Sequence, residues 1–259
     1  MHMFPRVLGA VVSIATLCAC VPASWAGGAT EQLREAHTVK TAQGAEEWRL
    51  TWSEPPTPVC AADDVEMAST CPCSGFAYGE QGHLSIIRLR DGKEIDRLDL
   101  TPLFAGADLM EGGLAVLQRQ APRPDDLDRF YADDPKLAAA IARRPETAIM
   151  KFADYDRDGR AEEFLLQVGT LPCDKHQFVA IGLPKGADRL RALTAEGTEE
   201  PLVLPLAAWE ALRRSTAPKT VETWACGDHG SEQREEMVVF ARDGAISVSE
   251  RSTPCAGTP

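Results

Sequence analysis

Short segments in which apolar and polar residues alternate make up much of the chain, and tight-turn signals separate them. Alternation with a period of two is typical of half-buried β-strands. Three pairs of such segments flank turns that contain Gly, and two of these turns carry Asp-Gly, a dipeptide that supplies the positive φ angles of a tight hairpin. The predicted hairpins pair residues 37–41 with 46–53, 83–90 with 94–100, and 236–241 with 245–251.

Two stretches have helical character, at about 125–144 and at 206–214. Asp134 and Pro135 suit the start of a helix, and arginine pairs stand near the end of each stretch. These helices are too few to cover a parallel sheet. We therefore predict a mainly β fold of antiparallel hairpins with two short helices, arranged either like a small β-propeller or as a β-sandwich.

The first 26 residues are typical of a secretory signal peptide. Arg6 supplies a positive start, residues 7–20 form an apolar run, and the segment 24–26 offers small residues for cleavage. We expect an exported protein, periplasmic or extracellular, with a single β-rich disulfide-containing domain at 27–259. No later segment approaches the roughly 20 apolar residues of a membrane-spanning helix.

A second interpretation of the leader remains open. The segment Leu17-Cys18-Ala19-Cys20 resembles a bacterial lipobox. Cys20 would then be acylated and become the new N-terminus. On that interpretation the protein is a lipoprotein anchored in the cell envelope rather than a freely exported domain.

The chain is acidic, with a formal net charge of −12. An acidic surface repels the phosphate backbone of nucleic acids and anionic membranes. We therefore expect no nucleic-acid partner. Divalent cations and basic partners are compatible with this charge, but the charge does not choose between them.

Six cysteines follow the leader, an even number that predicts disulfides in an oxidising compartment. They are Cys60, Cys71, Cys73, Cys173, Cys226 and Cys255. We expect Cys60 to pair with Cys71 or Cys73, and Cys226 to pair with Cys255 or Cys173. A zinc site that uses Cys60, Cys71, Cys73 and His83 is the alternative, but its spacing matches no zinc-binding pattern.

An acidic loop carries the most specific chemical signal of the chain. Its sequence is Asp154-Tyr155-Asp156-Arg157-Asp158-Gly159-Arg160-Ala161-Glu162, with carboxylates at alternate positions and Gly at the sixth. Such oxygen ligands are those that Ca²⁺ prefers. An EF-hand is excluded because its twelfth position, a bidentate Glu, is Leu165 here. The flanks 147–152 and 164–168 have the pattern of strands.

This unit of strand, acidic loop and strand resembles the FG-GAP or VCBS repeats of integrin-type β-propellers over about residues 149–169. The resemblance implies a Ca²⁺ site with Asp154, Asp156 and Asp158 as ligands, the backbone carbonyl of Arg160, and Glu162 as the closing carboxylate. Glu162 stands where the family has Asp, and Glu163 competes for that role. The motif occurs once here, whereas the family repeats it. The alternative is a metal-free acidic hairpin.

No motif names a reaction. Asp228, His229, Ser231 and Glu232 lie in one loop, which leaves a secreted hydrolase open, but no nucleophile turn accompanies them. We expect instead a non-enzymatic, calcium-binding module that binds a protein or glycan partner or serves as an envelope component. Trp48 and Trp52 fit core positions on one strand, with a sugar-stacking role as the alternative.

Overall fold

The computed structural model describes residues 31–70, 73–104, 113–171 and 175–256. The predicted signal peptide, the lipobox cysteine Cys20, and the cysteines Cys71 and Cys173 lie outside the described residues, as does the side chain of His229. The described part is mainly β, as predicted from the sequence, and short helices accompany the strands.

The strands form four antiparallel sheets. The first sheet has the order β1 (Gln32–Thr41), β2 (Gly44–Trp52), β5 (Leu84–Arg90), β6 (Lys93–Asp99). In the second, β9 (Lys175–Gly182) pairs with β8 (Phe164–Leu171), β10 (Arg191–Ala192) and β11 (Val203–Pro205). The third is β12 (Lys219–Trp224), β13 (Gln233–Arg242), β14 (Ala245–Pro254). The fourth is β3 (Thr57–Val59), β4 (Gly79–Gly82), β7 (Ala115–Gln118).

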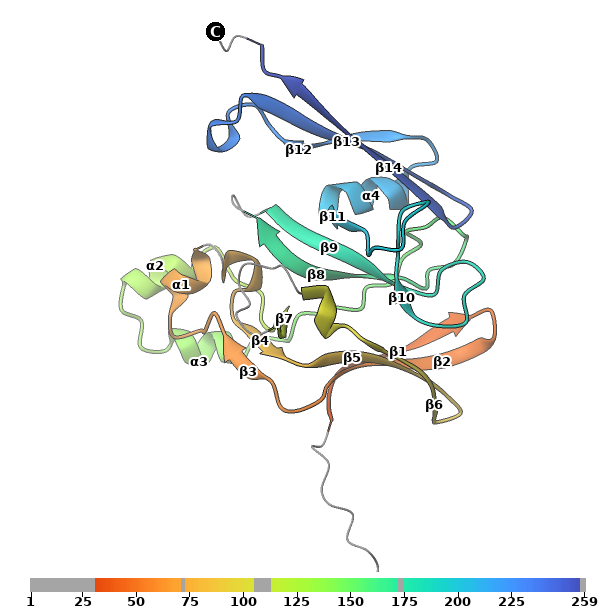
Figure 1. The fold of residues 1–259 in the computed structure, drawn as a ribbon. Helices are drawn as coiled ribbons and strands as arrows, with labels where there is room; N and C mark the ends of the chain where they lie inside the picture. Colours follow the sequence, from red (N-terminus) through yellow and green to blue (C-terminus); the bar gives the residue numbers. More distant parts are fainter. Residues whose placement is uncertain (1–30, 71–72, 105–112, 172–174, 257–259) are drawn as a thin grey trace, which may run out of the picture.

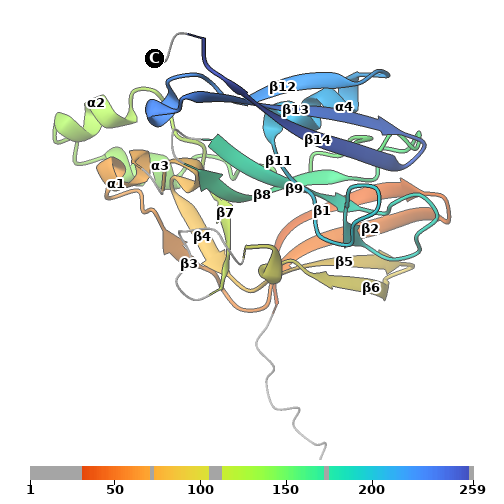
Figure 2. The ribbon, with the colours of Figure 1, turned by 45° about the horizontal axis from the view of Figure 1, so that its top comes forward.

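Three of the sheets are stacked as layers, with the second sheet between the first and the third (Figures 1 and 2). Trp48 and Ile86 of the first sheet and Phe164 of the second belong to one buried apolar cluster. A second cluster joins the other side of the second sheet to the third, and Trp209 and Val239 belong to it. Such face-to-face packing is common to β-sandwiches and to neighbouring propeller blades.

The helices are α1 (Val65–Ser69), α2 (Asp126–Tyr131), α3 (Leu137–Ala142) and α4 (Leu206–Arg214), and single 3₁₀ turns span Cys73–Phe76, Thr101–Phe104 and Asp228–Gly230. Helix α4 has the predicted bounds and lies between the second and third sheets (Figure 1). The stretch 125–144 consists of two helices, since Asp133 adopts a φ of 51° between them. The side chain of Asp134 accepts from the amide of Lys136 at 2.9 Å and does not cap α3.

The three predicted hairpins are confirmed as β1–β2, β5–β6 and β13–β14. Asp91 and Gly92 have φ angles of 51° and 73°, and Asp243 and Gly244 have 54° and 87°. Two successive positive φ angles match the right-handed twist of the flanking strands. The Asp-Gly dipeptides therefore account for these two turns, because they supply the successive positive φ angles.

The strand predicted over 147–152 is wrong, because this segment joins no sheet. The amides of Ile149 and Met150 donate to the carboxylate of Glu35 on β1, at 2.7 and 3.2 Å, instead of to a neighbouring strand. Isolated bridges flank the segment, since Glu146 pairs with Gln120 before it and Ala153 pairs with Glu163 after it. The apolar pattern is still meaningful because Met150 is buried in the core.

Two disulfides join Cys60 to Cys73 and Cys226 to Cys255, each one of the predicted alternatives. The first bond removes two thiolates from the zinc site considered above. Trp48 and Trp52 are fully buried, so they serve the core rather than a sugar-stacking surface. None of the described helices has the length and apolar character needed to cross a membrane.

Candidate metal centre

The acidic loop lies between the segment 147–152 and β8, and a bridge closes its base. The amide of Ala153 donates to the carbonyl of Glu163 at 2.8 Å, and the reverse bond is 3.3 Å long. Within the loop, Arg157 and Gly159 have φ angles of 60° and 95°. At 95°, Gly159 adopts a conformation that L side chains avoid, which accounts for Gly at the sixth position.

Backbone amides orient the first carboxylates of the loop. Asp154 accepts from the amides of Asp158 and Gly159, both at 3.1 Å, and Asp156 accepts from the amide of Asp158 at 3.0 Å. Asp154, Asp156 and Glu163 each offer a carboxylate oxygen, and these oxygens all lie within 4.8 Å of one another. We call these three residues the carboxylate cluster.

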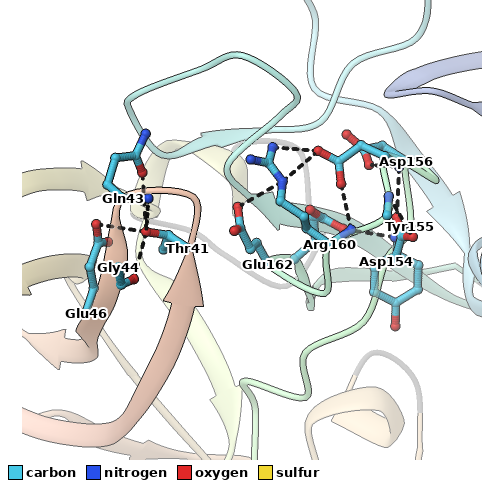
Figure 3. A network of polar contacts seen from close by, with 12 residues as sticks. Thr41, Gln43, Gly44, Glu46, Asp154, Tyr155, Asp156, Arg160 and Glu162 are labelled. Atoms are coloured by element: carbon cyan, nitrogen blue, oxygen red, sulfur yellow. Dashed lines mark hydrogen bonds and ion pairs between the residues drawn. The ribbon is translucent and has the colours of Figure 1, made fainter.

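Arg160 holds the other two acidic side chains of the motif. Its guanidinium donates to Asp158 at 2.6 and 3.0 Å, and its Nε lies 3.6 Å from Glu162 Oε2. Figure 3 shows Arg160 beside Glu162, with Asp154 and Asp156 to the right of both. The structure therefore brings together Asp154 and Asp156 of the predicted ligands with Glu163, and places Asp158 and Glu162 on Arg160.

The carboxylates are buried and incompletely hydrogen-bonded. Asp156 is 1 % exposed and Glu163 is fully buried. Asp156 Oδ2, Glu163 Oε1 and both carboxylate oxygens of Glu162 have no hydrogen-bond partner among the described residues. The amide of Tyr155 donates to Glu163 Oε2 at 2.9 Å, which fixes that side chain.

Burial, together with the neighbouring charge of Asp158, raises the pKa of Asp156 to about 6. Burial also raises the pKa of Glu163 to about 9. Unpaired buried carboxylates are costly in their charged form, and a bound cation offsets that cost. The donor set consists of hard oxygen ligands and contains no sulfur or imidazole, so it fits Ca²⁺.

The loop touches several layers of the fold. The amides of Asp243 and Gly244, at the β13–β14 turn, donate to the carbonyls of Arg157 and Asp156 at 3.1 and 3.0 Å. Arg157 Nη1 donates to the carbonyl of Arg213 at the end of α4, at 2.9 Å. An ion in the carboxylate cluster would stiffen a loop that contacts the third sheet, α4 and the second sheet.

Gly182 on β9 allows Glu163 its buried position. A Cβ at Gly182 would lie 2.6 Å from the carbonyl oxygen of Glu162 and 2.7 Å from Glu163 Cγ. The sequence predicted Glu163 only as a competitor of Glu162, and it predicted no role for Gly182. The signal for Glu163 was its place beside the last acid of the motif, and no local signal marks Gly182.

In the second candidate loop, the described bonds of Asp228, Ser231 and Glu232 are those of a turn. Asp228 Oδ2 accepts from Lys175 Nζ at 2.8 Å, and Ser231 Oγ donates to the carbonyl of Gln233 at 2.7 Å. Ser231 also accepts from the amide of Gln233, which is a local turn bond. Glu232 takes part through its carbonyl, which accepts from the amide of Cys255 at 2.9 Å. These bonds explain the loop as a turn beside the Cys226–Cys255 disulfide.

No protein-family model, no curated protein and no solved structure matches the chain.

Proposed function

We propose that this protein is a calcium-binding, disulfide-bonded β-rich module of an exported compartment, with a non-enzymatic role in binding or in envelope structure. The observation that carries the calcium assignment is the carboxylate cluster, in which Asp156 Oδ2 and Glu163 Oε1 are buried and have no hydrogen-bond partner among the described residues. Carboxylates that lack donors in the interior need a cation or a proton. A cation is the partner that the loop motif also predicts.

Asp154, Asp156 and Glu163 would hold the ion. Ca²⁺ takes about six to eight oxygen ligands, so carbonyl, water or further carboxylate oxygens complete its shell. The predicted ligands Asp158 and Glu162 join it on this proposal only if Arg160 releases them. The ion acts as a structural support on this proposal, because the loop that holds it contacts the third sheet and α4.

Isothermal titration of the metal-free protein with CaCl₂ tests the assignment. We expect one Ca²⁺ per chain and loss of binding in Asp156→Asn. Asp91→Asn is the matched control, because it removes the same charge from a tight turn of positive φ far from the loop in sequence. Unchanged binding in Asp156→Asn, or equal loss in both variants, would contradict the proposal.

Export is supported by the two disulfides, since such bonds persist in oxidising compartments. The mass of the mature chain purified from its native host tests this part. A chain that begins at Gly27 supports signal-peptide cleavage, and an acylated Cys20 supports the lipid-anchored form. A full-length cytoplasmic chain would overturn export.

A further inference from the structure

The inner faces of the second and third sheets enclose a cleft of about 780 Å³ beside the start of α4. Figure 1 shows α4 filling the space between β9 and β13 toward one end of the strands. Toward the other end, residues of β9, β11 and all three strands of the third sheet line the cleft. Both walls continue the faces that form the apolar cluster beside α4.

On the third sheet, carboxylates replace apolar residues where the inner face reaches the cleft. Val239 and Met237 point into the apolar cluster, and the next residue on that face of β13 is Glu235. Met237 lies opposite Glu250 of β14, and Glu235 lies opposite Ser252. Directly opposed residues of an antiparallel pair share a face. Glu235 and Glu250 therefore face the cleft, which both of them line.

These two carboxylates are not neutralised within the described part of the chain, where neither side chain forms an ion pair. Their neighbours differ. Glu236 pairs with Arg251 across the strands, and Glu222 pairs with Arg234 at 3.1 Å. The cleft thus presents two negative charges that have no cation of their own.

The opposite wall is aromatic and apolar. The rings of His176 and Phe178 on β9 lie 6.4 Å apart and line the cleft. Leu171, Val203 and Leu206 line it too, and they are 40 %, 42 % and 47 % exposed. Exposed apolar side chains scattered singly need no explanation, but their gathering at one polar-rimmed cleft marks an interaction site.

One end of the cleft already holds an ammonium group of the chain itself. Lys175 Nζ donates to Asp228 Oδ2 at 2.8 Å and to the carbonyl of Thr223 at 3.1 Å, and it lies 4.4 Å from the centre of the Trp224 ring. A carboxylate, a carbonyl and an aromatic face are the groups that stabilise a lysine side chain. The cleft therefore offers chemistry suited to cationic side chains.

We propose that this cleft binds an extended segment of a partner protein in which Lys or Arg alternates with apolar residues. The cations would pair with Glu235 and Glu250, and the apolar side chains would contact Phe178, Val203 and Leu206. The net charge of −12 favours such a partner through long-range attraction. This inference rests on the binding role proposed above but does not require the calcium site.

Fluorescence anisotropy with a short labelled peptide of alternating Lys and Leu tests the proposal near physiological salt. Peptides of alternating Glu and Leu, and of Lys and Ser, are the controls for charge and for apolar contact. We expect saturable binding of the first peptide only. The double variant Glu235→Gln/Glu250→Gln should weaken it by about tenfold or more, and Val203→Ser should weaken it by a smaller factor.

Glu54→Gln/Glu66→Gln is the matched control, because both residues are exposed, lie outside the cleft and carry the same total charge. It should leave the affinity within about twofold, a change of less than 0.5 kcal/mol by the usual conversion. Equal weakening in the two double variants would show non-specific attraction and overturn the proposal. Absence of saturable peptide binding would also overturn it, and so would a neutral oligosaccharide that binds in place of the peptide.

Repeating the peptide titration in EDTA, and comparing it with the CaCl₂ titration described above, separates the cleft from the calcium site. Peptide binding that persists while CaCl₂ fails to bind would contradict the calcium site alone. Calcium binding without peptide binding would contradict the cleft alone.

Discussion

Glu163 carries a fully buried carboxyl group whose Oε1 has no hydrogen-bond partner in the described part of the chain. Burial raises its pKa to about 9 from its ordinary value of 4.5, and it raises the pKa of Asp156 to about 6. The folded state therefore keeps protons that the unfolded chain releases at lower pH. Because the native state binds more protons, the free energy of unfolding of the metal-free protein falls as pH rises from 4.5 to about 9.

Calcium should oppose this pH dependence. In EDTA the melting temperature should be lower at pH 8 than at pH 5. The Glu163→Gln variant, measured alongside, gives the part of this difference that comes from the other titrating groups, and that part is subtracted. Ca²⁺ binds the deprotonated carboxylates, so the stabilisation by CaCl₂ should be larger at pH 8 than at pH 5. Thermal unfolding at both pH values measures the effect, and an equal calcium shift at both would contradict it.

Glu163→Gln separates the charge of this residue from its shape. In EDTA at pH 8 the variant should be at least as stable as the wild type, because a neutral amide avoids the cost of keeping a buried carboxyl protonated far above its ordinary pKa. It should lose most of the calcium response. Glu66→Gln, at an exposed position, is the control and should keep the response. A full calcium shift in Glu163→Gln would remove this residue from the ligand set.

Arg88 and Glu46 form a buried ion pair between β5 and β2. The two Arg88–Glu46 bonds are 2.7 and 2.9 Å long, and Arg90 adds a third at 2.6 Å. Burial acts to raise the pKa of Glu46, but the hydrogen bonds from Arg88 and Arg90 outweigh it and lower the pKa to about 2. The carboxylate therefore stays charged and depends on its partners.

Removal of one partner should be costly. Arg88→Ala leaves the Glu46 charge buried and should lower the free energy of unfolding by about 3–5 kcal/mol. Arg90 is 38 % exposed at its side chain, so Arg90→Ala should cost about 1 kcal/mol or less. Urea denaturation measures both. Equal losses would show that burial does not decide the strength of this network.

At the scale of elements, local signals determined the hairpins and α4, and long-range contacts determined the rest. Asp91-Gly92 and Asp243-Gly244 need no distant partner to form a turn. The segment 147–152 has the alternation of a strand, but Glu35 takes the amides of Ile149 and Met150. That competition comes from a residue more than a hundred positions away, and periodicity cannot show it.

The Cys60–Cys73 disulfide fastens the region around α1. Cys60 and Cys73 belong to a small apolar cluster with Val65, Tyr78 and Ile141. The bond closes a loop with a sequence separation of 13. Cys60→Ser/Cys73→Ser should therefore lower the free energy of unfolding by about 3 kcal/mol. Urea denaturation of the unreduced proteins measures this, and an unchanged midpoint would contradict it.

At the scale of the whole molecule, the acidic loop lies where the second sheet, α4 and the third sheet meet. The motif predicted a calcium loop, and its Asp154 and Asp156 do lie close together. The roles of Glu163 and Arg160 were not predictable, because they depend on Gly182 of β9 and on the hydrogen bonds from the β13–β14 turn. The cleft between the sheets was likewise absent from local patterns, since it is made by strands distant in sequence.

Thermal unfolding of the unreduced protein in EDTA and in millimolar CaCl₂, with Asp156→Ala alongside, is the decisive test of the calcium site. At a hundredfold excess over the dissociation constant, Ca²⁺ adds about 2.7 kcal/mol to the free energy of unfolding. That corresponds to a rise of roughly 5–10 °C in melting temperature for a domain of this size. We predict this rise in the wild type and its loss in Asp156→Ala. An unchanged melting temperature in the wild type, or an equal rise in the variant, would contradict the calcium site.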